Sequence, residues 1–138
     1  MKNVFKIFCL LGLFVFATPQ PSSAAVHLSS AQGHSAHYIE ENGNQLSLLI
    51  FGSEVQTAEQ LHQILASSLG FPHYYGMNLD ALFDMLTDSN ILSKEVYVII
   101  LNRTDLQENL GRDYFKSFVE TFRDAEKVMN GQLRFHIQ

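Results

Sequence analysis

"LHQILASSLGFPHYYGMNLDALFDMLT", residues 61–87, contains two helical patterns separated by a loop rich in aromatic residues. Just before it, Thr57 followed three residues later by Gln60 is typical of a helix start. Gly70 followed by Pro72 is typical of a helix end. The spacing therefore predicts a helix from 57 to 70 that leaves His62 outside its apolar stripe, which comprises Leu61, Ile64, Leu65 and Leu69.

The second pattern predicts a short helix that Asn78 caps and that ends near Thr87, with an apolar side formed by Leu79, Leu82, Phe83 and Leu86. Asp80, Asp84 and Asp88 recur every fourth residue on it, and no Lys or Arg occurs in residues 71–89. Like charges at this spacing cost a few tenths of a kcal/mol each, so stability does not explain them. Two interpretations stay open, a solvated helix face and a surface for a cationic partner.

Two segments before and after this stretch predict strands. Residues 37–52 read HYIEENGNQLSLLIFG, where Asn42-Gly43 is a strong hairpin signal. The nearly continuous apolar run at 46–51 predicts a strand buried on both faces, and EVYVIIL at 95–101 predicts a central strand. The pattern does not determine whether the hairpin adds a fourth, antiparallel strand to the sheet.

The C-terminal third completes an α/β pattern. Residues 102–111, NRTDLQENLG, predict a polar connector with one helical turn. A helix follows at 112–130, with a buried stripe of Tyr114, Phe115, Phe118, Val119 and Phe122, and QLRFHIQ at 132–138 predicts a final strand. The β-α-α-β-α-β order favours right-handed crossovers and a small parallel sheet with helices packed against it.

The N-terminus reads as a secretory signal peptide over residues 1–24. Lys2 and Lys6 precede an uncharged apolar run at 7–17, and small residues lead to a cleavage site after Ala24 or, fitting almost as well, after Ala25. The run is shorter than the roughly 20 apolar residues of a membrane span. We therefore expect an exported, periplasmic or secreted protein without stable membrane insertion after cleavage; a retained anchor is the alternative.

Removal of residues 1–24 from the 138-residue chain leaves 114 residues, enough for one domain, which we place at 38–138. Cys9, the only cysteine, lies in the signal, so the mature protein has no disulfide. Loss of two lysines changes the net charge from −5 to −7. This acidic balance argues against direct nucleic-acid binding and favours a cationic partner.

Residues 25–37 are small, polar and aperiodic, which predicts a flexible leader. His27, His34 and His37 lie within it. A solvated tail is favoured over a metal site, because no cysteine or acidic residue completes a ligand set. We therefore expect neither a metal nor a cofactor.

The stretch at 61–87 strongly resembles the barstar family of intracellular ribonuclease inhibitors, chiefly through PHYYGMNLDALFDMLT at 72–87. The resemblance continues more weakly to residue 138 and covers about residues 45–138. It implies three parallel strands packed with about four helices. It also implies an inhibitor rather than an enzyme, one whose acidic helix occupies a ribonuclease active site in place of substrate phosphates.

The resemblance also assigns roles to single residues. Asp84 would be the central anchor for the enzyme's arginines, Asp80 a second acidic contact, and Tyr74 a stacking residue. The rest of the contact would comprise Gly76, Asn78, Leu79, Phe83 and Thr87. Each position has a structural interpretation as well: Tyr74 and Phe83 as core aromatics, Gly76 as a turn residue and Asn78 as a cap. Tyr75 is assigned to the core.

Three departures from the family pattern bear on the partner. Phe83 and Ser89 stand where typical members have Trp, and Arg112 stands at an acidic position. Typical members are also cytoplasmic, whereas this chain carries an export signal. We expect a monomer that binds a small, cationic, secreted or periplasmic ribonuclease in a 1:1 complex. The alternatives are a barstar-fold interaction module for another partner, and a carboxylate-based metal site or enzyme using Asp80, Asp84 and His73.

Overall fold

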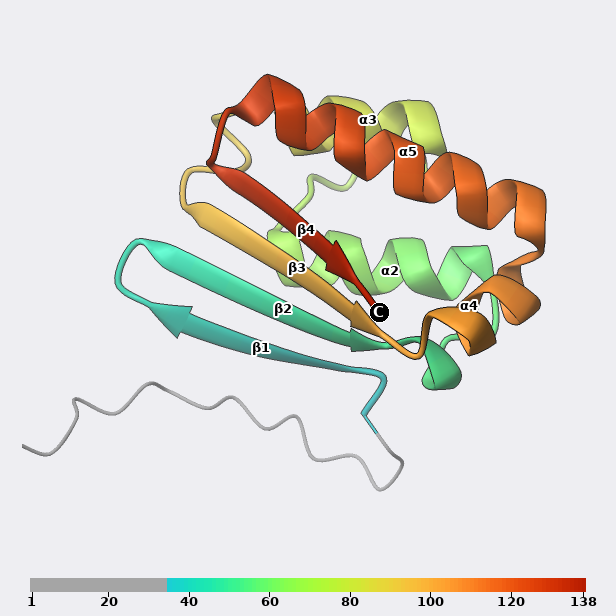
Figure 1. Ribbon diagram of the computed structural model, residues 1–138. Coiled ribbons are helices and arrows are strands. Elements are labelled where there is room, and N and C mark those ends of the chain that lie inside the picture. Colours follow the sequence, from blue (N-terminus) through green and yellow to red (C-terminus); the bar gives the residue numbers. More distant parts are fainter. Residues whose placement is uncertain (1–34) are drawn as a thin grey trace, which may run out of the picture.

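The computed structural model describes residues 35–138, which form a four-stranded sheet packed with helices (Figure 1). The strands are β1 (His37–Asn42), β2 (Gln45–Phe51), β3 (Glu95–Leu101) and β4 (Leu133–Ile137). The helices are η1 (Gly52–Glu54), α2 (Ala58–Leu69), α3 (Leu79–Thr87), α4 (Arg103–Leu110) and α5 (Arg112–Met129). The proposed signal peptide, His27 and His34 lie outside the described residues.

The strand order is β1-β2-β3-β4. Strands β2, β3 and β4 are parallel, and β1 joins β2 as an antiparallel hairpin. The prediction of a three-stranded parallel α/β sheet is confirmed, as is the interior position of β3. The hairpin at Asn42-Gly43 does add a fourth strand, because the apolar run of β2 offers its free edge to β1 over a full register from His37↔Ile50 to Asn42↔Gln45.

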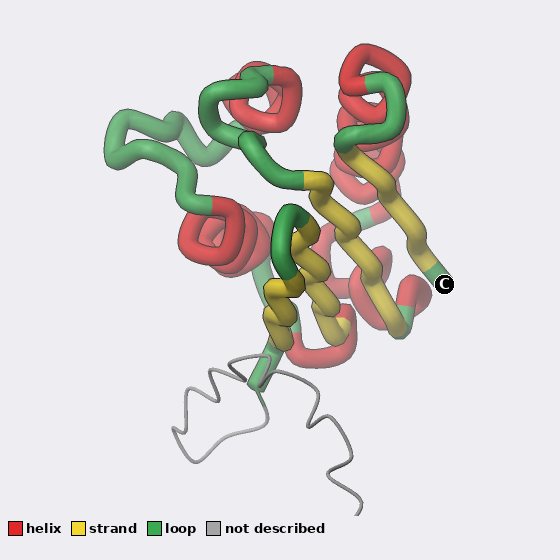
Figure 2. Tube along the Cα trace, turned by 90° about the vertical axis from the view of Figure 1, so that its left-hand side faces the viewer, coloured by secondary structure: helices red, strands yellow, loops and turns green. Residues whose placement is uncertain are grey.

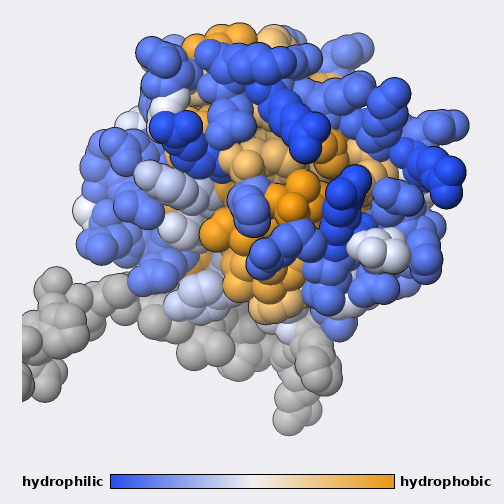
Figure 3. All heavy atoms as spheres, in the orientation of Figure 1, coloured by the Kyte–Doolittle hydropathy of each residue, from blue (hydrophilic) through white to orange (hydrophobic). Residues whose placement is uncertain are grey.

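The helices cover only one face of this sheet. Along β2, Leu48 and Ile50 are fully buried toward the helices, whereas Leu49 and Phe51 on the other face are half-buried. Figure 1 shows the helices behind and above the sheet, and in Figure 3 hydrophobic side chains gather on the uncovered face. The prediction that β2 is buried on both faces is therefore wrong, because a continuous apolar run does not reveal whether helices cover one face or two.

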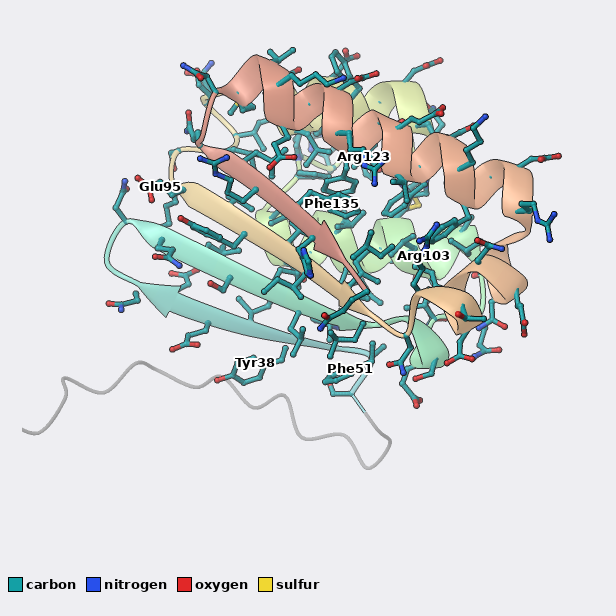
Figure 4. The ribbon with its side chains drawn as sticks, viewed as in Figure 1. Tyr38, Phe51, Glu95, Arg103, Arg123 and Phe135 are labelled. Atoms are coloured by element: carbon teal, nitrogen blue, oxygen red, sulfur yellow. The ribbon has the colours of Figure 1, made fainter. Side chains whose placement is uncertain are left out.

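Helix α5 packs on the same face as the other helices and supports α3. The ring of Phe122 stacks on Phe135 of β4 with centroids 4.5 Å apart, and Phe118 contacts Phe135 edge-on. Figure 4 shows Phe135 between β4 and α5. Helix α3 packs against α5, and its Leu82 and Leu86 are fully buried in the core. The opposite side of α3 is left facing outward.

Two segment predictions need correction. Residues Arg103–Leu110 form the helix α4 rather than a connector with one turn. The sequence of α4 is largely polar and shows no apolar periodicity, because Leu106 is the only fully buried residue of the helix. The leader was predicted to extend through His37, but His37 begins β1, and the carbonyl of Ala36 already accepts a hydrogen bond from the N–H of Phe51 at 2.9 Å. Within residues 35–138, no helix is long and apolar enough to span a bilayer.

Candidate functional site

The end of α2 directs the chain into the aromatic loop. Gly70 adopts a left-handed conformation (φ 69°), and the N–H of Phe71 bonds to the carbonyl of Ala66 at 2.9 Å, as expected of a glycine-terminated helix. At the start of α2, the N–H of Gln60 donates to the Thr57 hydroxyl oxygen at 3.1 Å. The predicted capping box is half-formed, because the Gln60 side chain accepts from the N–H of residue 56 instead of Thr57.

The loop between α2 and α3 turns two consecutive tyrosines in opposite directions. Tyr74 is 68% exposed, whereas Tyr75 is 8% exposed and meets Phe71 edge-on at 5.0 Å between ring centroids. The N–H of Tyr75 bonds to the carbonyl of Pro72 at 3.0 Å and closes a tight turn. Tyr75 is confirmed as a core residue, and the core interpretation of Tyr74 is wrong. Figure 2 shows the loop projecting beyond the helices, away from the strands.

Three residues join this loop to α3. The left-handed conformation falls on Met77 (φ 48°) rather than on Gly76. A side chain at Gly76 would place its Cβ 3.0 Å from Nδ2 of Asn78, so glycine permits this close approach. The Asn78 side chain accepts a hydrogen bond from the N–H of Ala81 at 2.8 Å, which confirms the predicted cap.

Met77 is a surface residue that the sequence analysis missed. Its side chain is 44% exposed, and it lies between Gly76 and Asn78 at the entry to α3. Nothing in the sequence marks it, because methionine has no preference for positive φ. Together with Tyr74 it gives the loop an exposed apolar surface.

The three aspartates of α3 have different surroundings. Asp80 and Asp84 are exposed, and within residues 35–138 neither side chain takes part in an ion pair or hydrogen bond. Asp80 lies in the first turn, where the positive end of the helix dipole favours it. Asp88 follows the helix, and its Oδ1 accepts from the N–H of Asn90 at 2.8 Å and from its amide at 3.0 Å. Asp88 is therefore a local turn residue, while Asp80 and Asp84 are free to contact a partner.

Three further predicted site residues are half-buried. Leu79 and Phe83 pack against the core with part of each side chain still accessible, so the core interpretation of Phe83 is partly right. The Thr87 hydroxyl donates to the carbonyl of Phe83 at 2.8 Å, an internal helix contact. Ser89 and Arg112, the first residue of α5, are exposed. The outward side of α3 thus presents two carboxylates flanked by apolar edges.

His62 lies outside the apolar stripe of α2, as its position in the sequence indicated, but it is buried. It is 1% exposed, its Nε2 lies 2.6 Å from the hydroxyl of Tyr114, and its Nδ1 contacts the hydroxyl of Tyr75. The periodicity of α2 could not reveal this, because the two partners lie 13 and 52 residues away in sequence. The loop and α5 close over this side of α2.

Burial changes the acidity of all three groups in this cluster. It lowers the pKa of His62 below its usual value of 6.5. Burial, and to a lesser extent the neighbouring Tyr114, raises the pKa of Tyr75, and burial raises that of Tyr114. The imidazole and both phenols are therefore neutral at pH 7.

The described residues do not assemble a metal centre. Residues 35–138 contain no group of three or more His, Cys, Asp or Glu side chains placed to hold an ion. His73 contacts Tyr74 edge-on with ring centroids 5.8 Å apart and does not join Asp80 and Asp84 in such a group. His37 has its side chain half-buried in β1.

Comparison with known proteins agrees with this architecture. The model of a family described as barstar (barnase inhibitor) matches residues 45–138. A Bacillus subtilis (strain 168) protein named putative ribonuclease inhibitor YrdF is 29% identical over 91 residues, which cover 66% of this chain and 97% of that protein. The matched region runs from the first residue of β2 to the C-terminus and contains the loop and α3. The chain belongs to the barstar family.

Proposed function

We propose that this protein inhibits a cationic ribonuclease by inserting α3 and the preceding loop into its active-site cleft. Membership of the family and the name of the Bacillus subtilis relative support a ribonuclease as partner. The observation that carries the proposal is the pair Asp80 and Asp84, exposed on one side of α3 and without a basic partner among the described residues. The protein itself is not an enzyme in this proposal.

The charge arrangement suits such a cleft. Residues four apart on a helix lie on the same side, so the two carboxylates project together. Arginine and lysine side chains that bind RNA phosphates can make charge-assisted hydrogen bonds to them. The Asn78 cap and the buried Leu82 and Leu86 hold the helix in place, so little ordering is required when the partner binds.

The loop supplies the apolar part of the proposed contact. Tyr74 and Met77 are exposed, and large side chains of this kind are enriched at the centres of protein interfaces. Leu79 and Phe83 offer accessible edges beside the carboxylates. We propose that Tyr74 stacks on the enzyme, Asp84 anchors its phosphate-binding cations, and Asp80 adds a second acidic contact. Gly76, Asn78 and Thr87 would line the rest of a 1:1 interface with the monomer.

We further propose that the protein acts outside the cytoplasm. The support is the pattern of residues 1–24, with two lysines, an apolar run and a small-residue cleavage site. The partner is then a periplasmic or secreted ribonuclease. The test is to express the full chain and sequence the N-terminus of the exported product, which we expect to begin at Ala25 or Val26. Retention of the protein inside the cell with residues 1–24 attached would overturn this part.

The inhibition itself is tested with the purified exported product against barnase-type and periplasmic ribonucleases, using hydrolysis of a fluorogenic RNA. We expect stoichiometric inhibition by the wild-type protein. Asp84→Ala should weaken binding by about 2–5 kcal/mol, which is at least about 30-fold in Kd. Asp88→Asn is the matched control, because it removes one charge but keeps the Oδ1 that bonds to Asn90.

Two results would contradict the proposal. One is the absence of both inhibition and binding with every ribonuclease tested, measured by calorimetry. The other is equal loss of affinity in Asp84→Ala and Asp88→Asn, which would mean that net charge and not the exposed side of α3 determines binding. A partner captured instead from extracytoplasmic extract that is not a ribonuclease would favour the interaction-module alternative.

A further inference from the structure

His62 lies where three structural elements meet. It belongs to α2, Tyr75 comes from the loop that presents Tyr74, and Tyr114 comes from the first turns of α5. Both ring nitrogens are used, since Nδ1 contacts the Tyr75 hydroxyl and Nε2 lies 2.6 Å from the Tyr114 hydroxyl. The imidazole therefore ties the loop to two helices at once.

The hydrogen bonds of this bridge depend on the charge of the imidazole. A neutral imidazole has one donor and one acceptor nitrogen, so one tyrosine hydroxyl accepts from the ring and the other donates to it. A protonated imidazole has two donors, and the tyrosine that donated must turn its O–H away. Protonation at a site that is 1% exposed thus reverses one of the two bonds, takes from that tyrosine's O–H its acceptor on the ring, and buries a charge.

Within residues 35–138, no carboxylate pairs with His62 to compensate for that charge. The titratable groups that face His62 are Tyr75 from the loop and Tyr114 from α5. Among the ion pairs and hydrogen bonds of residues 35–138, none joins a carboxylate to His62. The neutral ring is accordingly the form that the fold accommodates, in agreement with the direction in which burial shifts its pKa.

We propose that His62 is a positioning residue: its neutral imidazole fixes the loop that presents Tyr74, and its protonation releases that loop and weakens partner binding at acidic pH. The inference rests on the proposed function of the loop and α3. Tyr74 and Tyr75 are adjacent, so a shift of the buried ring moves the exposed one. If the protein is exported as proposed, it meets a more variable pH than a cytoplasmic protein does, so that a pH dependence of partner binding would be relevant there.

The first test uses the free protein and does not need a partner. Nuclear magnetic resonance of the tyrosine rings is followed from pH 7.5 to pH 5.0. We expect the Tyr74 and Tyr75 signals to shift together with titration of His62, at a pH below 6.5. In His62→Gln, which keeps one donor and one acceptor but cannot be protonated, these shifts should disappear. Identical titrations in the two proteins would overturn the proposal.

The second test measures partner affinity at pH 7.5 and pH 5.0. We expect His62→Ala to weaken binding at both pH values, and His62→Gln to bind within about threefold of wild type at pH 7.5. The wild-type affinity should fall about tenfold more than that of His62→Gln at pH 5.0. Because both proteins meet the same enzyme, titration of the enzyme cancels in this ratio. A ratio within twofold of unity would overturn the proposal.

Two control variants separate the effect of the buried His62 from that of two exposed histidines. His73→Gln tests the imidazole beside Tyr74, and His136→Gln tests one on β4; both should keep the pH dependence of the wild type. Should His62→Gln fail to fold, Tyr114→Phe removes a single hydrogen bond while keeping the ring. It should weaken binding at pH 7.5. Absence of ribonuclease binding at every pH contradicts the proposed function alone, because the tyrosine titration still tests the positioning role.

Discussion

The side-chain oxygen of Asn78 accepts a hydrogen bond from the backbone N–H of Ala81 at 2.8 Å. This bond fixes the first turn of α3 and hence the direction in which Asp80 projects. An N-cap of this kind contributes about 1 kcal/mol to stability. Asn78→Ala should lower the free energy of unfolding in urea by about that amount, whereas Asn78→Ser should not, because serine caps equally well. Equal losses in both variants would contradict the capping role.

Association with the partner should depend on salt through α3. The Debye length falls from about 30 Å at 0.01 M salt to about 8 Å at 0.15 M, so steering by Asp80 and Asp84 weakens over that range. Stopped-flow association rates should fall with ionic strength in the wild type and less steeply in Asp84→Asn. Asp88→Asn carries the same charge change away from the exposed pair. It should keep most of the wild-type slope, and matching slopes in the two variants would contradict the steering.

Stability and binding should separate at two aromatic residues. Phe122 is fully buried and stacked on Phe135, so Phe122→Ala should cost about 3–5 kcal/mol of folding free energy. Tyr74 is 68% exposed, so Tyr74→Ala should change stability by less than about 0.5 kcal/mol while weakening partner binding. Denaturation in urea and calorimetric titration distinguish the two effects. A large loss of stability in Tyr74→Ala would mean that the ring supports the fold.

Two glycines should respond differently to substitution. A Cβ at Gly52 would lie 2.7 Å from the carbonyl oxygens of Leu101 and Asn102, which are backbone atoms and cannot easily move. Gly43 has a left-handed φ of 59° and open space around it. The substitution Gly52→Asn should therefore lower the free energy of unfolding by about 1–3 kcal/mol or more. Gly43→Asn should be nearly neutral in thermal unfolding, because asparagine tolerates that conformation.

Folding stability should decline on mild acidification. Burial lowers the pKa of His62 in the folded state, so the unfolded chain, with a pKa near 6.5, takes up the proton first. The contribution of neutral His62 to the folding free energy is fully present above pH 6.5. It is lost as the pH falls from 6.5 through the lowered pKa of the folded state, by at most about 1.4 kcal/mol per pH unit. Urea midpoints at pH 7.5 and pH 5.0 measure this loss. In His62→Gln, the free energy of unfolding should keep only the smaller pH dependence that comes from other groups, such as the half-buried His37.

Local signals gave much of the fold correctly. Thr57, Gly70 and Asn78 act on backbone groups within a few residues of themselves, so the limits of α2 and the start of α3 could be read without knowledge of the rest of the chain. The predictions of strands at 46–51 and 95–101 were also correct, since a short apolar run and β-branched residues favour a strand locally. Helix α4 was not predicted, because a largely polar segment shows almost no hydrophobic periodicity.

Some features of the candidate site could be predicted from the sequence, and others depend on the folded chain. The run of Asp80, Asp84 and Asp88 was visible in the sequence, and so was the resemblance that pointed to Tyr74. That Asp88 serves a turn while the other two stay unpaired depends on which groups the folded chain brings near each carboxylate. The positive φ of Met77 likewise could not be predicted from its residue type, because methionine has no preference for that conformation.

The amino-acid sequence by itself determined the limits of α2, the start of α3, the strands and the acidic side of α3, because these follow from interactions between residues close together along the chain. Only the tertiary structure decided that one face of the sheet lacks helices and that His62 is enclosed. Both outcomes depend on contacts between distant segments, such as the bond from His62 to Tyr114 across 52 residues. Periodicity within one helix indicates its apolar face but does not identify the distant segments that pack against the helix.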